Sequence, residues 1–192
     1  MSRESRPERR VAVTGIGLIS PLGTGTDKTW QALLRGESGI GPLTRFDLTR
    51  YATRFGGEVK DFDPLVFVDR KEARKMDLFI RFGLGAADLA VRDSGLPPGD
   101  LQSDRAGVYV GSGIGGLGAI EENHKVLLEK GPDRVTPFFI IQTVINEASG
   151  QISIRFGAKG PNCANATACA TGTHAIGDSF RIIARGDADI MI

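Results

Sequence analysis

The chain has 192 residues, of which 41% are hydrophobic and 24% are charged, and its formal net charge is +1. This composition argues against a disordered chain, and the sequence shows no apolar run long enough for a membrane span or a signal-peptide core. A net charge so close to zero gives no general argument for nucleic-acid binding. The two cysteines, without a disulfide framework, favour a reducing environment, so we expect a soluble cytoplasmic protein.

The predicted elements alternate between strands and helices. Residues 1–9 are polar and charged, and we expect a disordered tail there. Residues 10–15 form a short apolar run closed by glycine, which is typical of a buried strand. Further along the chain, the pattern predicts helices over 28–35, 78–93, about 117–130, about 142–156 and 170–185, and strands at 105–110 and 163–167. This alternation predicts an α/β fold with a mostly parallel sheet and helices on both faces.

The last residues, 188–192, are predicted to begin another apolar strand. A domain seldom ends inside a buried strand, because the hydrogen-bond ladder and the apolar face both need further residues to complete them. We therefore expect residues 10–192 to form one domain that is incomplete at its C-terminal end.

Cys169 stands where a predicted strand passes through a turn of small residues, 165–172, into the helix over 170–185. Helix N-termini present unpaired N–H groups and a positive partial charge, and both favour a nucleophilic thiolate. The small neighbours leave room for a substrate. The alternative is a buried, inert cysteine. Local sequence leaves both interpretations of Cys169 open, whereas Cys163, inside the strand, fits the inert one.

A cysteine nucleophile usually needs a histidine base, and the sequence contains only His124 and His174. His174 follows Cys169 by five positions, which places it about 140° around the helix and away from the same pocket. His124 follows Glu121 and Glu122 on a polar helix face, where solvent exposure is expected. We therefore expect the base to be missing from this chain.

A glycine-rich segment lies between the strand at 105–110 and the next helix. Gly111, Gly113 and Gly116 match the G-x-G-x-x-G pattern of dinucleotide sites. Such a site normally follows the first strand and needs an acidic residue about 20 positions on, whereas the nearest candidate, Asp133, lies in a predicted turn. Glycines that let the loop pack against a substrate channel or another backbone explain the segment equally well.

A charged segment, residues 69–77, carries a concentration of basic side chains. If the segment is helical, Lys71, Arg74 and Lys75 lie on one face. That face could steer an acidic partner, or it could be an ordinary solvated helix surface. The segment is short and lacks the aromatic residues typical of a nucleic-acid site, so we expect no nucleic-acid partner.

Taken together, these segments resemble the β-ketoacyl-acyl-carrier-protein synthases, most closely the synthase II type of bacterial fatty-acid elongation. The resemblance covers nearly the whole chain from Arg10 onward, as its N-terminal half. It rests on many matches in the same order, which lie at residues 13–17, 20–23, 51–57, 70–77, 111–117, 121–124, 137–139, 160–162, 165–172 and 181–189.

The resemblance implies a thiolase-like fold of two similar α/β halves, a homodimer, and no cofactor or metal. It implies that Cys169 takes an acyl chain from an acyl carrier protein. Malonyl-carrier protein then loses carbon dioxide, and its carbanion attacks the acyl thioester. Two histidines and a lysine that assist this step belong to the second half of the family's longer chains, so the 192-residue chain alone is predicted not to condense substrates.

The resemblance also assigns roles to individual positions. Ile114 matches the residue that gates the acyl pocket, and Phe139 matches the one that reaches the partner subunit's acyl tunnel. Lys71, Arg74 and Lys75 match the surface on which the carrier protein docks. A polyketide ketosynthase and a non-catalytic chain-length factor are the alternatives, although chain-length factors typically lack the nucleophile that Cys169 provides here.

Overall fold

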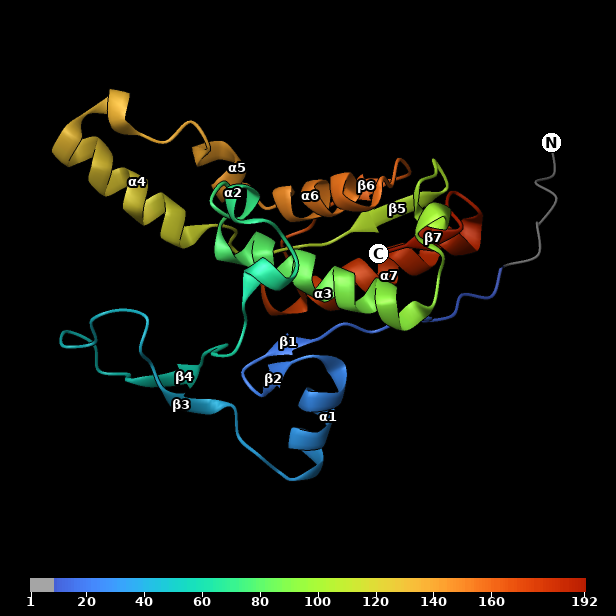
Figure 1. The fold of residues 1–192 in the computed structure, drawn as a ribbon, viewed down its shortest axis with the longest axis horizontal. Coiled ribbons are helices and arrows are strands. Elements are labelled where there is room, and N and C mark those ends of the chain that lie inside the picture. The colour runs from blue at the N-terminus through green and yellow to red at the C-terminus, as the bar shows by residue number, and fades with distance from the viewer. Residues whose placement is uncertain (1–8) are drawn as a thin grey trace.

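The computed structural model describes residues 9–192, so residues 1–8 of the predicted tail lie outside the described residues. A body of helices around a small sheet carries an N-terminal arm below it (Figure 1). The arm contains α1 and two short hairpins, β1–β2 and β3–β4. Their bounds are α1 Thr26–Leu34, β1 Ile19–Ser20, β2 Gly23–Thr24, β3 Ile40–Pro42 and β4 Phe55–Gly57.

The body contains the remaining helices and strands. The helices are α2 Arg70–Ala73, α3 Leu78–Ser94, α4 Leu117–Lys130, α5 Phe139–Thr143, α6 Glu147–Phe156 and α7 Thr171–Arg185. The strands are β5 Ala106–Tyr109, β6 Asn162–Cys163 and β7 Ile190–Met191. No helix of residues 9–192 is both long and apolar enough to cross a bilayer.

A parallel sheet with the strand order β6-β5-β7 lies at the centre of the body. Val108 of β5 is in register with Asn162, and Ala106 is in register with Ile190. Parallel neighbours need helical crossovers, which α6 and α7 supply along the chain. The predicted class, an α/β fold with a parallel sheet, is confirmed.

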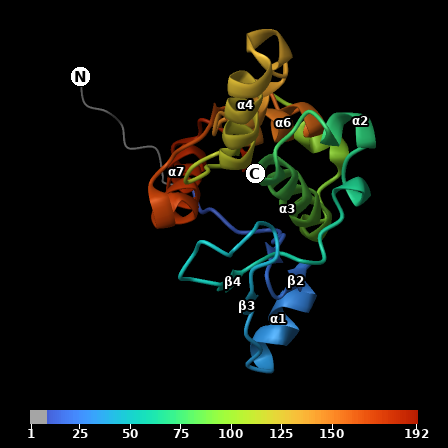
Figure 2. The ribbon, with the colours of Figure 1, turned by 90° about the vertical axis from the view of Figure 1, so that its left-hand side faces the viewer.

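The hydrophobic core lies between β5 and the helices α3 and α6. Ile80 of α3, Val108 of β5 and Ile152 of α6 are each fully buried and belong to one cluster. In Figure 2, α3 and α6 lie on one side of the body and α7 on the other, so helices cover both faces of the small sheet. The sequence places the ends of α3 well, because Asp77 caps its N-terminus and Gly95 takes the left-handed conformation after its last turn.

The strand predicted at residues 10–15 is wrong, since this segment pairs with no other strand in the described part of the chain. Instead it runs along α3 at very close range. A Cβ added at Gly15 would lie 2.1 Å from the carbonyl oxygen of Ala90, and one at Gly17 would lie 1.9 Å from that of Ala86. The neighbouring edge of β5 is taken by β7. A cavity of about 450 Å³ separates the segment from α7.

Two other predicted elements are shorter than expected. The helix predicted over about 142–156 is two helices, α5 and α6, because Val144 is extended with φ −76° and ψ 134°. The strand predicted at 163–167 ends at Cys163, after which Asn165 and Thr167 enter a network of side-chain hydrogen bonds. At the N-terminus, Arg9, the last residue of the predicted tail, donates a hydrogen bond to Asp189 at 2.6 Å.

Candidate functional site

Cys169 is exposed and lies in a one-turn 3-10 helix, Ala168–Ala170, that leads directly into α7. The residue before it, Ala168, has φ +48° and is the one non-glycine residue with positive φ within residues 9–192. This conformation costs roughly 1–2 kcal/mol for a residue with a Cβ. Such strain persists only where the surroundings hold it, and it is typical of functional turns.

Side chains on both sides of the cysteine hold this turn. The N–H of Thr167 donates to Oγ1 of Thr171 at 2.9 Å, and that hydroxyl donates to the carbonyl oxygen of Ala168 at 2.8 Å. Nδ2 of the buried Asn165 donates to Oγ1 of Thr167 and to the carbonyl oxygen of Thr171, both at 3.2 Å. The predicted position of Cys169 at the start of the helix is therefore matched by a turn built to expose it.

The glycine-rich loop packs against the cysteine turn. A Cβ at Gly111 would lie 2.5 Å from the carbonyl oxygen of Asn165, and the N–H of Ser112 donates to the same oxygen at 3.2 Å. A Cβ at Gly113 would lie 3.7 Å from the carbonyl oxygen of Ala168. Ile114 comes next, with its side chain 68% exposed. The close approach explains Gly111 without a nucleotide, whereas a Cβ at Gly113 would make only ordinary contact, and the packing brings Ile114 near the cysteine turn.

The far end of the same loop packs against α5. Gly115 has φ +84°, and a Cβ at Gly116 would lie 1.9 Å from the carbonyl oxygen of Gln142. Phe139, the first residue of α5, is half-buried. The loop therefore connects the turn that carries Cys169 with the helix that carries Phe139.

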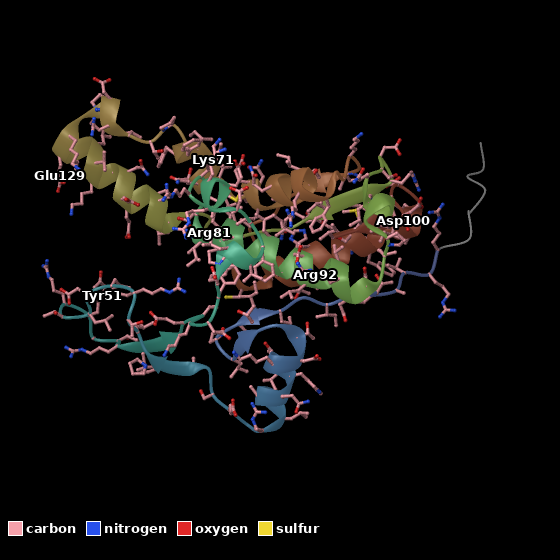
Figure 3. All side chains as sticks on the ribbon, in the orientation of Figure 1. Tyr51, Lys71, Arg81, Arg92, Asp100 and Glu129 are labelled. Carbon is pink, nitrogen blue, oxygen red and sulfur yellow. The ribbon has the colours of Figure 1, made fainter. Side chains whose placement is uncertain are left out.

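The predicted basic residues, Lys71, Arg74 and Lys75, lie in and just after α2, near α5. Lys71 and Arg74 are exposed, whereas Nζ of Lys75 lies 2.6 Å from Oε1 of Glu72 and 5.9 Å from the centre of the Phe138 ring. The helix is short, and Arg74 is its C-terminal cap. Figure 3 shows Lys71 at the top of this region and Arg81 below it. Within residues 9–192, Lys71 and Arg74 form no ion pair, and neither does the exposed Arg70 at the start of α2.

Side chains of α5 tie this face to the rest of the site. Nε2 of Gln142 donates to the carbonyl oxygen of Arg74 at 3.4 Å, while the backbone of Gln142 lies against Gly116 of the loop. Packing contacts thus connect Arg74 and Lys75, through α5 and the glycine loop, to the turn that carries Cys169.

Neither histidine is placed to act as a base. His124 is exposed on α4. Nδ1 of His174 lies 3.3 Å from Oγ1 of Thr167, and its Nε2 lies 3.0 Å from Oδ2 of Asp178. Both ring nitrogens of His174 are therefore already engaged by groups other than the cysteine sulfur.

The partners of His174 extend into the sheet, a connection that was not predicted from the sequence. The Tyr109 hydroxyl donates to Oδ2 of Asp178 at 3.0 Å, and Arg181 donates to Oδ1 at 3.2 Å. The Tyr109 hydrogen bond, together with the hydrogen bond and charge of Arg181, lowers the pKa of Asp178. Burial and the Asp178 carboxylate raise the pKa of Tyr109. The i, i+4 spacing of His174 and Asp178 is visible in the sequence, whereas the contact with Tyr109 is not.

Comparison with known proteins identifies the family. Residues 8–192 match the family model described as "Beta-ketoacyl synthase, N-terminal domain". The chain belongs to the β-ketoacyl synthase family.

Similar sequences include two bacterial proteins named 3-oxoacyl-[acyl-carrier-protein] synthase 2. The protein from Vibrio harveyi is 50% identical over 185 residues, which are 96% of this chain and 45% of the relative. The protein from Staphylococcus aureus is 48% identical over 184 residues, which are 96% of this chain and 44% of the relative. The chain spans about half the length of the curated relatives it matches.

Solved structures of ketosynthases have the same fold. The ishigamide ketosynthase/chain length factor superposes with a TM-score of 0.86 at 31% identity, over 96% of this chain and 46% of that one. A β-ketoacyl synthase from Burkholderia phymatum superposes with a TM-score of 0.78 at 26% identity, over 92% and 44%. The predicted thiolase-like fold, in the form of its N-terminal half, is confirmed.

Proposed function

We propose that this chain provides the nucleophile of a 3-oxoacyl-[acyl-carrier-protein] synthase of fatty-acid elongation. The observation that carries the proposal is the exposed Cys169, held on a strained turn at the start of α7. Sequence comparison supports the proposal, because the chain is 50% identical to a protein named 3-oxoacyl-[acyl-carrier-protein] synthase 2. The runner-up is a polyketide ketosynthase, because one structural neighbour is a type II polyketide ketosynthase in complex with its acyl-carrier protein. That neighbour is only 26% identical, so fatty-acid elongation is favoured.

In the proposed reaction the Cys169 thiolate attacks the thioester carbonyl of an acyl carrier protein, forms a new thioester and releases the carrier's thiol. The start of α7 supplies N–H groups and a positive partial charge that favour both the thiolate and the oxyanion of the tetrahedral intermediate. Malonyl-carrier protein would then lose carbon dioxide, and its carbanion would attack the acyl group on Cys169, break the thioester bond, release the Cys169 thiolate and leave a β-ketoacyl chain on the carrier protein. Decarboxylation produces the carbanion without a strong base, so this second step mainly needs oxyanion stabilisation.

The carrier protein is proposed to dock on the basic face through Lys71 and Arg74, with Lys75 beside them. A carrier bound there would reach Cys169 along the path formed by α5 and the glycine loop. Ile114, exposed on that loop, and Phe139, at the start of α5, are proposed to contact the acyl chain. A homodimer and a cytoplasmic location complete the proposal.

The condensation step is not expected from this chain alone. The sequence contains two histidines, and in the structure one is exposed on α4 while the other has both ring nitrogens engaged. The chain should therefore accept an acyl group without forming a β-ketoacyl product. Detection of that product from the pure 192-residue chain would show that this expectation is wrong.

The alternative from another class is a non-catalytic chain-length factor. A fatty-acyl epoxide separates the two functions, because ring opening by a thiolate leaves a stable thioether on the nucleophile. The proposed synthase should be modified at Cys169, with Cys169→Ala unlabelled and Cys163→Ala labelled as fully as the unmodified sequence. A scaffold would leave Cys169 unmodified, as read by peptide mass spectrometry.

A further inference from the structure

Four side chains form a continuous hydrogen-bonded chain from the central sheet to the cysteine turn. Tyr109 of β5 donates to Asp178 of α7 at 3.0 Å, and Asp178 lies 3.0 Å from Nε2 of His174. Nδ1 of His174 lies 3.3 Å from Oγ1 of Thr167, two residues before Cys169. This Tyr109–Asp178–His174–Thr167 chain joins three separate segments and ends beside the strained residue of the turn.

We propose that Asp178 is a positioning residue for Cys169, acting through His174 and Thr167 to hold the cysteine turn in its strained conformation. The inference rests on the proposed role of Cys169 as nucleophile. It adds to that role a device, anchored in the sheet by Tyr109, that keeps the sulfur at the start of α7.

The directions of the hydrogen bonds single out Asp178. A carboxylate only accepts, so it accepts a hydrogen bond from the Tyr109 hydroxyl and favours the tautomer of His174 that carries its proton on Nε2. Nδ1 of His174 is then an acceptor, and the Thr167 hydroxyl donates a hydrogen bond to it. Oγ1 of Thr167 in turn accepts from Nδ2 of Asn165 at 3.2 Å. Every donor in this hydrogen-bonded chain thus has one acceptor. The Asp178 carboxylate, which can only accept, fixes which group donates at each step.

The strain explains why such a chain is needed. Ala168, between Thr167 and Cys169, has φ +48°, and an alanine released from its surroundings returns to negative φ. The hydrogen bonds of Thr167 with Thr171 and Asn165 resist this locally. His174, on α7, forms a further hydrogen bond with the Thr167 hydroxyl. Tyr109 adds rigidity, because its strand is paired on both edges.

Alkylation by iodoacetamide tests the inference, with peptide mass spectrometry reading Cys169 and Cys163 in the same sample. We expect Asp178→Asn to slow alkylation of Cys169 by about five- to tenfold, a range typical of coupled hydrogen-bonded residues. Thr167→Val should slow it similarly, because it removes the hydroxyl. Thr167→Ser should react like the unmodified sequence, because it restores the hydroxyl. Cys163 should react at the same rate throughout.

The double variant Thr167→Val/Asp178→Asn distinguishes positioning from general loosening. Because both residues act through one chain, the double variant should be no slower than the slower single variant. Arg185→Gln is the control, because Arg185 also lies on α7 but takes no part in the hydrogen-bonded chain. It should leave the alkylation rates of both cysteines unchanged. Melting curves accompany each variant, and if Thr167→Val fails to fold, Asp178→Asn and Tyr109→Phe carry the test.

Unchanged or faster alkylation of Cys169 in Asp178→Asn, or additive effects in the double variant, would overturn the positioning role and leave the proposed function standing. If Cys169 in the unmodified sequence reacts no faster than Cys163, the proposed nucleophile itself is wrong. The two failures are therefore distinguishable in one experiment.

Discussion

Arg105 holds Asp189 through both carboxylate oxygens, with Nε 3.0 Å from Oδ2 and Nη2 2.8 Å from Oδ1. Arg9 adds a third hydrogen bond, to Oδ1 at 2.6 Å. The cluster joins the start of β5 to the segment that enters β7. Hydrogen bonds from Arg105 and then Arg9 hold the pKa of Asp189 well below its ordinary range.

The first prediction concerns pH and stability. Because the pKa of Asp189 is lower in the folded state, its pairing stabilises the fold above the unfolded-state pKa of about 4, and this contribution is lost as the pH falls toward the folded-state pKa. Asp189→Asn should therefore melt at a lower temperature than the unmodified sequence at pH 7, with the difference shrinking below about pH 4. Asp187→Asn is the control, since Asp187 pairs with the exposed Arg185. A difference that is constant from pH 7 to pH 3 would contradict the prediction.

The second prediction concerns the core between α3, β5 and α6. Ile80 is fully buried, so Ile80→Ala should lower the free energy of unfolding by about 2–5 kcal/mol. Ile154→Ala, a matched change on α6, should have a far smaller effect because its side chain is 75% exposed. Urea unfolding of both variants checks this, and similar losses in the two would place the core elsewhere.

The third prediction concerns the glycine loop. Gly111→Ala places a methyl group 2.5 Å from the carbonyl oxygen of Asn165, so it should destabilise the protein by about 1–3 kcal/mol and disturb the cysteine turn. Gly177→Ala, in open space within α7, should instead stabilise the fold by about 0.5–1 kcal/mol. Thermal unfolding measures both changes. A harmless Gly111→Ala would show that close packing does not require this glycine.

The fourth prediction concerns the basic face. Lys71→Glu should weaken binding of an acidic acyl carrier protein by about tenfold at low salt, and added salt should reduce the difference. Arg50→Glu makes the same charge change beside Tyr51, on a loop well separated from Lys71 in Figure 3, and should bind normally. Equal losses in both variants, measured by calorimetry, would mean that net charge rather than this face controls docking.

Periodicity and end signals predict the helices of the body well. The apolar stripe within 78–93, which ends before Gly95, predicts α3 to within one residue, and the helix expected over about 117–130 agrees with α4. Two predicted elements differ from the structure. Val144 looks compatible with a helix but is extended, and residues 10–15 have the composition of a strand without a paired neighbour. Strand pairing depends on distant segments, which local sequence does not specify.

Some features of the candidate site can likewise be predicted from local sequence, and others cannot. The position of Cys169 at the start of a helix follows from local sequence, whereas for the glycines local sequence left packing beside a weak match to a dinucleotide site. The strain at Ala168 and the contact of Tyr109 with Asp178 depend on distant segments meeting, so they emerge only from the structure.

The most direct test of the central claim is to incubate the chain with fatty-acyl carrier protein and locate the transferred acyl group by peptide mass spectrometry. The account predicts an acyl thioester on Cys169, which hydroxylamine cleaves and Cys169→Ala abolishes, with Cys163 unmodified. An acyl group on Cys163 instead, or none on a folded chain that binds the carrier protein, would contradict it.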